Sequence, residues 1–154
     1  MKIEVSPFLQ KESSTCLPTC IRIVLHHFGI DLSEEKLAEI CKTNEEGSSL
    51  KEAAKALRSR GFEVIELKEA DLFELVDHIT RGNPVIVAVE VQQLPYGETG
   101  GHAVVICGFE KNEVQYIEPA LGKEMSLDLL TFFKAWDSLS RSGLIIYPKI
   151  NSPE

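Results

Sequence analysis

Four residues from two distant segments have the types that a thiol nucleophile site requires. Gln10 and Cys16 lie in QKESSTCLPTC near the N-terminus, and His102 and Glu118 lie in GGHAVVICGFEKNEVQYIEPALG. A cysteine attacks as a thiolate, a histidine transfers the proton, a carboxylate orients the imidazole, and an amide stabilises the oxyanion. The set therefore predicts acyl transfer through an acyl-enzyme on Cys16.

Cys16 lies at the predicted start of a helix. Thr15 or Ser14 can cap this helix, and Pro18 falls in its first turn, where a missing N–H costs nothing. The positive end of the helix dipole stabilises a thiolate, so a thiol at this place is more acidic than a free one. The backbone N–H of Cys16 and the side-chain amide of Gln10 are the candidate oxyanion donors.

His102 is the candidate general base because the other histidines are badly placed. His26 and His27 lie on the predicted helix that Cys16 begins, roughly 15 Å along its axis from the thiol. His78 lies in another predicted helix and has the character of a surface residue. His102 follows two glycines at a junction between loop and strand, where the imidazole is accessible.

Glu118 is the candidate group that orients the imidazole. The segments around His102 and Glu118 are expected to form a hairpin that turns at Lys111 and Asn112. Residues at equal distances from a turn pair with each other, so His102 is expected opposite about residue 121. Glu118 is close enough to this position for its carboxylate to meet the imidazole.

Hydrophobic periodicity and capping residues predict the elements that carry these side chains. Three helices are expected in the first sixty residues, the second capped by Ser33 and the third by Ser49. Further helices are expected over 71–82 and 126–136, and strands over 62–67, 84–91, 102–110, 113–120 and 144–148. The pattern predicts one α+β domain over 1–154, with helices on one side of an antiparallel sheet.

Bulk properties restrict the partners and the compartment. The formal net charge of −8 disfavours nucleic acid and anionic membranes as partners, and no apolar run is long enough to span a bilayer. The N-terminus lacks the apolar stretch of a secretory signal. The four cysteines have no disulfide-like spacing, so we expect reduced thiols in the cytoplasm.

Other readings of the same residues stay open. Cys16 could be a buried structural thiol, and Glu118 a solvent-facing residue at a strand end. Cys16, Cys20 and His27 share a helical face but spread too far for tetrahedral zinc, so no metal or other cofactor is expected. The acidic run NEEG is expected to be solvated surface, and the glycine-containing loop 92–101 to contact the substrate.

The two motifs together resemble those of the C39 peptidases in the papain-like superfamily. The resemblance rests on a glutamine, five residues, a cysteine, three residues and a second cysteine before a hydrophobic helix, then a distant histidine and Glu-Pro-Ala-x-Gly. It covers roughly the whole domain, with the N-terminal motif on residues 10–29 and the C-terminal motif on residues 102–122. It implies a papain-like fold with Cys16 as nucleophile, His102 as general base and acid, Glu118 as orienter and Gln10 as oxyanion donor.

Members of that family are cysteine endopeptidases, so the resemblance implies a peptide or protein substrate. Those fused to bacteriocin exporters cut leader peptides after Gly-Gly, and others stand alone or have lost the cysteine and only bind peptides. Many members have Asp-Cys-Gly around the cysteine, where this chain has Thr15-Cys16-Leu17, and most have Asp in place of Glu118. A degenerate peptide-binding domain and an acyl transferase using the same thiol are the alternatives to a peptidase.

Overall fold

The computed structural model describes residues 1–90 and 101–148. The helices are α1 (Cys16–His27), α2 (Glu34–Ile40), α3 (Leu50–Ser59), α4 (Leu72–Thr80) and α5 (Leu129–Asp137). The strands are β1 (Glu63–Leu67), β2 (Val85–Glu90), β3 (Gly101–Glu110), β4 (Glu113–Glu118), β5 (Lys123–Asp128) and β6 (Gly143–Tyr147). The loop expected to contact the substrate lies, apart from Gly101, outside the described residues.

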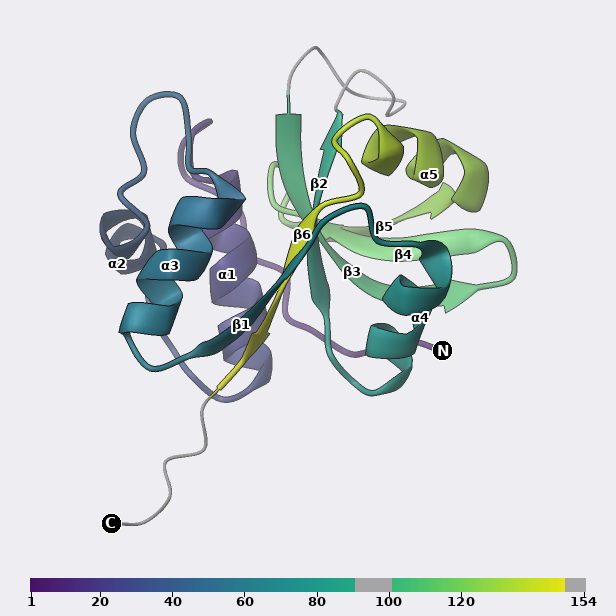
Figure 1. The fold of residues 1–154 in the computed structure, drawn as a ribbon, viewed down its shortest axis with the longest axis horizontal. Coiled ribbons are helices and arrows are strands. Elements are labelled where there is room, and N and C mark those ends of the chain that lie inside the picture. The colour runs from purple at the N-terminus through teal and green to yellow at the C-terminus, as the bar shows by residue number, and fades with distance from the viewer. Residues whose placement is uncertain (91–100, 149–154) are drawn as a thin grey trace.

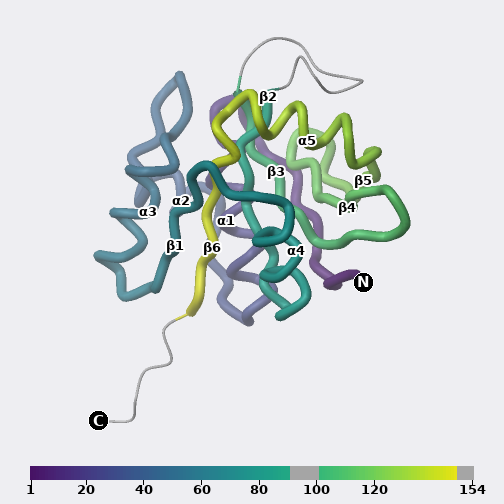
Figure 2. The backbone as a smooth tube through the Cα atoms, turned by 45° about the vertical axis from the view of Figure 1, so that its right-hand side comes forward, coloured from purple at the N-terminus to yellow at the C-terminus, as the bar shows by residue number. Residues whose placement is uncertain are grey.

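The strands form one antiparallel sheet in the order β1-β6-β2-β3-β4-β5. The helices α1, α2 and α3 lie on one side of the central strands β2 and β3, whereas α4 and α5 lie on the other (Figures 1 and 2). The α+β class and the N-terminal helical half packed against the sheet are confirmed. The expectation of helices on one side only was wrong, and the burial of every residue from 103 to 108 fits a strand covered on both faces.

Side-chain caps start the helices α2, α3 and α4 where the sequence places them. Ser33, Ser49 and Asp71 each accept the backbone N–H of the third residue that follows. At α1 the expected cap is absent, because the Thr15 hydroxyl bonds to both the carbonyl and the N–H of Glu12 instead. The helix nevertheless begins at Cys16.

The strand β5 is the element that the sequence analysis missed. A helix was expected from Ser126, but β5 pairs with β4 over residues 123–128, and α5 starts at Leu129 with Asp128 accepting the N–H of Thr131. Only Leu127 of this edge strand is buried, so its sequence carries little hydrophobic signal. An edge strand with one inward side chain is hard to distinguish from the first turn of a polar helix.

The helix α1 is held rigidly against the middle of the sheet. It packs on β3 and β2, and Ile21, Val24 and Leu25 are completely buried. Buried aliphatic side chains of this size each stabilise the fold by about 1.5–3 kcal/mol, so the position of the helix start is well determined. Across the described ranges 1–90 and 101–148, no helix combines the length and apolarity needed to cross a membrane.

Candidate active site

Cys16 is the first residue of α1 and lines a cleft between the helical half and the sheet. The cleft has a volume of about 360 Å³. Its walls come from the segment before α1 and the start of that helix, the turn between α2 and α3 with the first residue of α3, the facing parts of β2 and β3, and the second residue after α5. The lining residues besides Cys16 are Ser13, Ser14, Leu17, Glu45, Glu46, Gly47, Ser48, Leu50, Ala88, Gly101, His102, Ala103 and Leu139. The thiol and the imidazole therefore face one shared space that is large enough for a few atoms of a substrate chain.

His102 and Glu118 are in direct contact. Nε2 of His102 lies 2.5 Å from Oε2 of Glu118, and the same oxygen accepts the backbone N–H of Ala120 at 3.0 Å. The Glu118 side chain has no exposed surface, and that of His102 is 11% exposed. Because Nε2 is occupied by the carboxylate, Nδ1 is the ring nitrogen left for the hydrogen bond between His102 and Cys16.

A β-bulge in β3 changes the register of the hairpin from the one expected. Gly108 pairs with Gln115, but Ile106 pairs with Tyr116, so Cys107 is an extra residue on β3. The segment before the bulge is shifted by one residue against β4. The N-terminus supports this region, because Lys2 forms a bridge with Gly108.

The shifted register places Glu118 on the same face of the sheet as His102. Val105 pairs with Ile117, so the next residues, Val104 and Glu118, are opposite each other, and His102 is a diagonal neighbour on that face. An unbroken register would pair Glu118 with Val105 and direct its carboxylate to the other face, because a shift of one residue reverses every side chain. The expected pairing near residue 121 was therefore wrong by one residue, and the bulge is the reason.

The surroundings of Cys16 and His102 favour a thiolate beside an imidazolium. Burial raises the pKa of Cys16, but the hydrogen bond and charge of His102, with backbone N–H groups of Ala103 and Leu17, outweigh it and lower the pKa overall. Burial lowers the pKa of His102, but its bonds to Cys16 and Glu118 raise it to about 9. At neutral pH both shifts support the charged pair.

The other three cysteines have the opposite character. Burial raises the pKa of Cys41 to about 11. Burial and the charge of Glu124 raise that of Cys107 to about 12. Burial, with the charges of Cys16 and Glu118, raises the pKa of Cys20 well above its ordinary value. Cys16 is therefore the one cysteine of the four whose surroundings stabilise a thiolate.

Comparison with known proteins identifies the family of the chain. Residues 2–144 match the family model described as the Peptidase_C39 like family. The chain belongs to this family. It is 30% identical over 115 residues to an uncharacterized protein of Methanothermobacter thermautotrophicus, a match that covers 75% of this chain and 72% of that protein. It is 25% identical over 140 residues to the lactococcin-G-processing and transport ATP-binding protein LagD of Lactococcus lactis, which covers 91% of this chain but only 18% of LagD.

Solved structures show that this member of the Peptidase_C39 like family has the papain-like fold of C39 peptidase domains. The peptidase domain of Streptococcus ComA, a bifunctional ABC transporter, matches with a TM-score of 0.74 and 26% identity over 94% of this chain and 97% of that domain. A double-glycine-motif protease from an AMS/PCAT transporter, solved with its leader peptide, matches with a TM-score of 0.74 and 19% identity over 96% and 94% of the two chains. The expected fold and family are confirmed.

Gln10 lies beside the end of β4, where Pro119 follows Glu118. Its backbone N–H donates to the carbonyl of Pro119 at 2.9 Å, and its side-chain Nε2 donates to the carbonyl of Glu12 at 2.7 Å. Its Oε1 is buried and has no hydrogen-bond partner within the described part of the chain. One N–H of the amide is thus used within the chain, and the second is left for another acceptor.

The turn between α2 and α3 is a cleft wall that sequence reasoning missed. Glu45 and Glu46 line the cleft, and a Cβ on Gly47 would lie 3.7 Å from the carbonyl oxygen of Ser14, just before the nucleophile. The acidic run is exposed, as expected, but it is also part of the candidate site. No local signal marks it, because its position beside Cys16 results from the packing of α2 and α3.

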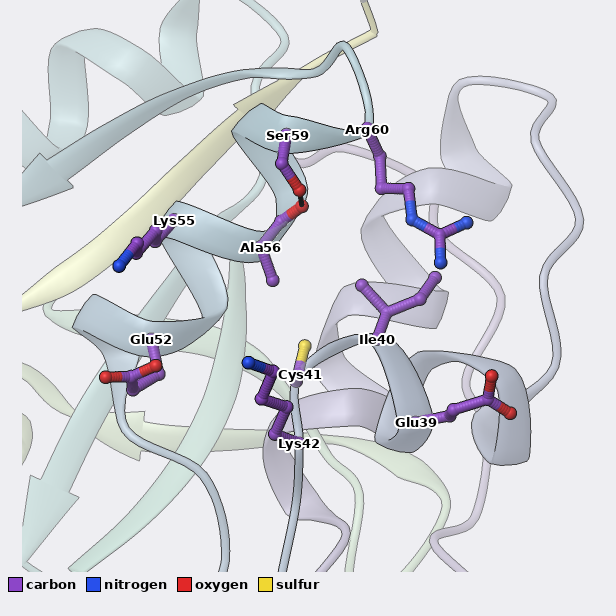
Figure 3. A pocket seen from close by; sticks show the side chains of 9 residues that line it. All are labelled: Glu39, Ile40, Cys41, Lys42, Glu52, Lys55, Ala56, Ser59 and Arg60. Atoms are coloured by element: carbon purple, nitrogen blue, oxygen red, sulfur yellow. Dashed lines mark hydrogen bonds between the residues drawn. The ribbon is translucent and has the colours of Figure 1, made fainter.

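A second cavity of about 340 Å³ lies between α2 and α3 (Figure 3). Cys41 lines it, together with Lys42, Lys55 and Arg60. No histidine is among the described residues that line this cavity, and the thiol has no partner that would lower its pKa. We therefore assign the chemistry to the cleft at Cys16.

Proposed function

We propose that the chain is a cysteine peptidase that hydrolyses a peptide bond through an acyl-enzyme on Cys16. The observation that carries the proposal is the position of His102, which bonds to Glu118 through Nε2 and lowers the pKa of Cys16 on its other side. A nucleophile, a base and an orienting group in this order are the requirement for thiol catalysis. We further propose that residues 1–154 act as a single peptidase domain.

The reaction follows from the charged pair. The Cys16 thiolate attacks the carbonyl carbon of the substrate and forms a tetrahedral intermediate with a negative oxygen. The His102 imidazolium gives its proton to the leaving amine, the C–N bond breaks, and a thioester remains. Neutral His102 then takes a proton from water, the resulting hydroxide attacks the thioester, and the proton returns to the departing thiolate or remains on His102. Glu118 keeps the ring in the tautomer and orientation that these transfers need.

The negative oxygen of the intermediate needs donors that are already in place. The backbone N–H of Cys16 at the start of α1 is one candidate, since the N–H groups of a first helical turn have no partner within the helix. The remaining N–H of the Gln10 amide is the second. We assign Gln10 this role, in accord with the family resemblance.

The substrate is proposed to be a peptide or protein segment. LagD is named for the processing of lactococcin G, and the AMS/PCAT protease was solved with a leader peptide, so a leader peptide is one candidate for this chain. The chain spans only 18% of LagD, and transport by the longer protein is not carried over. Four free thiols favour a reducing compartment, and we propose the cytoplasm.

Two departures from the common family pattern are compatible with activity. Leu17 replaces a glycine beside the nucleophile and lines the cleft, but it is only 3% exposed and packs in the core, so little of its side chain takes up space in the cleft. Glu118 replaces an aspartate, and its extra methylene spans the diagonal to His102. These two placements favour a working peptidase over a degenerate peptide-binding domain.

Hydrolysis of a peptide pool, followed by mass spectrometry of the products, tests the proposal. Cys16→Ala is expected to abolish turnover, whereas Cys41→Ala, a matched change at another cavity-lining cysteine, is expected to retain it. Free carboxyl products indicate a peptidase, and products joined to an added amine indicate an acyl transferase. Peptide binding by wild type without any turnover would overturn the proposal in favour of the degenerate domain.

A further inference from the structure

Glu34 carries a carboxylate that is buried although it stands at the start of a surface helix. Its exposure is 2%, and its two oxygens accept the backbone N–H of Lys11 at 2.9 and 3.2 Å. Burying a carboxylate is costly unless hydrogen bonds compensate it. The Lys11 N–H, which both oxygens share, supplies a hydrogen bond of this kind, so the contact is a specific anchor between α2 and the segment before Cys16.

The anchor acts on the peptide that immediately follows Gln10. The N–H of Gln10 itself donates to the carbonyl of Pro119, and the N–H of Lys11 donates to Glu34. The backbone of Gln10 is therefore held from two directions, by the end of β4 and by α2. Gln10 is thus fixed relative to Glu118, which directly precedes Pro119 in the chain.

The orientation of the Gln10 amide is fixed by the same short segment. The carbonyl of Glu12 accepts the Gln10 Nε2 at 2.7 Å, the Thr15 hydroxyl at 2.9 Å and the Thr15 N–H at 3.2 Å. Three donors on one carbonyl leave it little freedom to rotate. The amide nitrogen is thereby kept on the side of Glu12, and its second N–H has a defined direction.

We propose that Glu34 is a positioning residue that holds Gln10 in place for stabilising the oxyanion, an inference that rests on the proposed function. Glu34 acts through Lys11 and does not touch the substrate. A donor displaced by about 1 Å loses much of its effect on the transition state. The Glu34–Lys11 contact therefore contributes to turnover because it keeps the Gln10 amide in position, although Glu34 does not contact the oxyanion. Its loss affects kcat more than KM, because the oxyanion exists only in the transition state and intermediate.

The neighbouring Glu35 provides a matched control. It lies in the same first turn and also contacts Lys11, but through the side-chain Nζ at 2.6 Å and in an exposed pair. An exposed pair of this kind contributes little to stability. Glu34→Gln removes the charge while leaving an oxygen that can accept one N–H, so the fold is expected to survive.

The test compares peptide turnover of wild type, Glu34→Gln, Glu35→Gln, Gln10→Ala and the double variant Glu34→Gln/Gln10→Ala. Glu34→Gln is expected to lower kcat roughly 10-fold with KM little changed, and Glu35→Gln to leave both within about 2-fold. Alkylation of Cys16 is expected to keep its rate. In the Gln10→Ala background, Glu34→Gln should add less than about 2-fold, because the residue through which it acts is gone. An undiminished effect in that background would overturn the inference.

A readout without turnover separates this inference from the proposed function. In ¹⁵N-labelled protein the side-chain Nε2 of Gln10 should have the heteronuclear NOE of an ordered group in wild type and Glu35→Gln, and the lower value of a mobile group in Glu34→Gln. An ordered Gln10 amide in Glu34→Gln would overturn the inference even if wild type hydrolyses peptides. An absence of hydrolysis by wild type would instead overturn the proposed function, and the NOE values would still decide whether Glu34 orders Gln10.

Discussion

Two cavities of similar size each contain a cysteine, and they differ in what stands beside the thiol. The cleft at Cys16 has a volume of about 360 Å³, and the cavity at Cys41 one of about 340 Å³. His102 faces Cys16 and lowers its pKa, whereas burial alone raises the pKa of Cys41 to about 11. A hollow with a cysteine is therefore not sufficient for a thiol site. The charged partner and the N–H groups around the sulfur make the difference.

The two regions also differ in how they are assembled. The cavity at Cys41 lies between two consecutive helices and depends on local packing (Figure 3). The cleft at Cys16 combines a helix start with two strands, β2 and β3, that are roughly seventy to ninety residues further along the chain. Its chemistry depends on the register of the sheet, since the bulge at Cys107 decides which face Glu118 occupies.

The largest expected contrast is in thiol reactivity. At pH 7 a thiol with a pKa of about 11 is ionised to about one part in 10⁴, whereas the pKa of Cys16 is lowered, so iodoacetamide should modify Cys16 at least about 10² times faster than Cys41 in the native protein. Peptide mapping by mass spectrometry measures both rates, and the protein unfolded in urea provides the reference. Comparable rates in the folded protein would remove the distinction between the two cavities.

Gln10→Ala is the next largest test and addresses the oxyanion. Loss of one preorganised donor should lower kcat by about 10²- to 10³-fold, with the alkylation rate of Cys16 unchanged. Steady-state peptide hydrolysis measures kcat, and iodoacetamide labelling measures the alkylation rate of Cys16. Turnover within about 3-fold of wild type would show that Gln10 has no part in the mechanism and that backbone N–H groups alone stabilise the oxyanion.

Glu118→Gln tests the sheet half of the site. The charge of Glu118 raises the pKa of His102, so the neutral amide should lower it, and we expect kcat/KM to fall by roughly 10- to 100-fold. In wild type kcat/KM should decline as pH rises through about 9, where the imidazolium loses the proton that the leaving amine needs. In the variant this decline should move to lower pH. An unmoved pH profile would mean that Glu118 does not control the imidazole.

The sequence contains enough signal for the helices of the site but not for the register of its hairpin. Ser33 and Ser49 predict helix starts correctly because capping is a local interaction between a side chain and the next turn. Local residues also identify His102 and Glu118 as candidates. Whether they share a face depends on one extra residue in β3. The isolated Gly108 beside Cys107 is a general sign of a bulge or of a close backbone approach, but it does not determine the register.

The missed parts have the same physical origin. The bulge is supported by Lys2, from the opposite end of the chain, and the acidic wall at Glu45 is placed by the packing of α2 and α3. Both depend on contacts between residues that are far apart in sequence. Periodicity and capping rules do not contain such information, so they predict which elements exist better than they predict how the elements meet.

The smallest expected effect concerns the charge of the two cavities. Glu45 and Glu46 line the cleft at Cys16, and no lysine or arginine is among its described lining residues. The cavity at Cys41 is lined by charged residues of both signs: Lys42, Lys55, Arg60, Glu39 and Glu52. Neither glutamate has a salt-bridge partner in the part of the chain that the structure describes. The acidic wall should therefore disfavour an anionic reagent at Cys16.

The electrostatic effect of Glu45 and Glu46 at Cys16 can be measured with iodoacetate and iodoacetamide, because the two reagents share a leaving group and differ in charge. For Glu45→Gln/Glu46→Gln the ratio of the iodoacetate rate to the iodoacetamide rate at Cys16 should rise about 2- to 5-fold at low salt, and the rise should diminish in about 1 M salt. Glu52→Gln, which removes a carboxylate from the cavity at Cys41, is the matched control and should leave the ratio unchanged. Equal ratios in wild type and the double variant would show that the turn forms a wall of the cleft without shaping its potential, and charge would then have no part in how the two cavities differ at the sulfur.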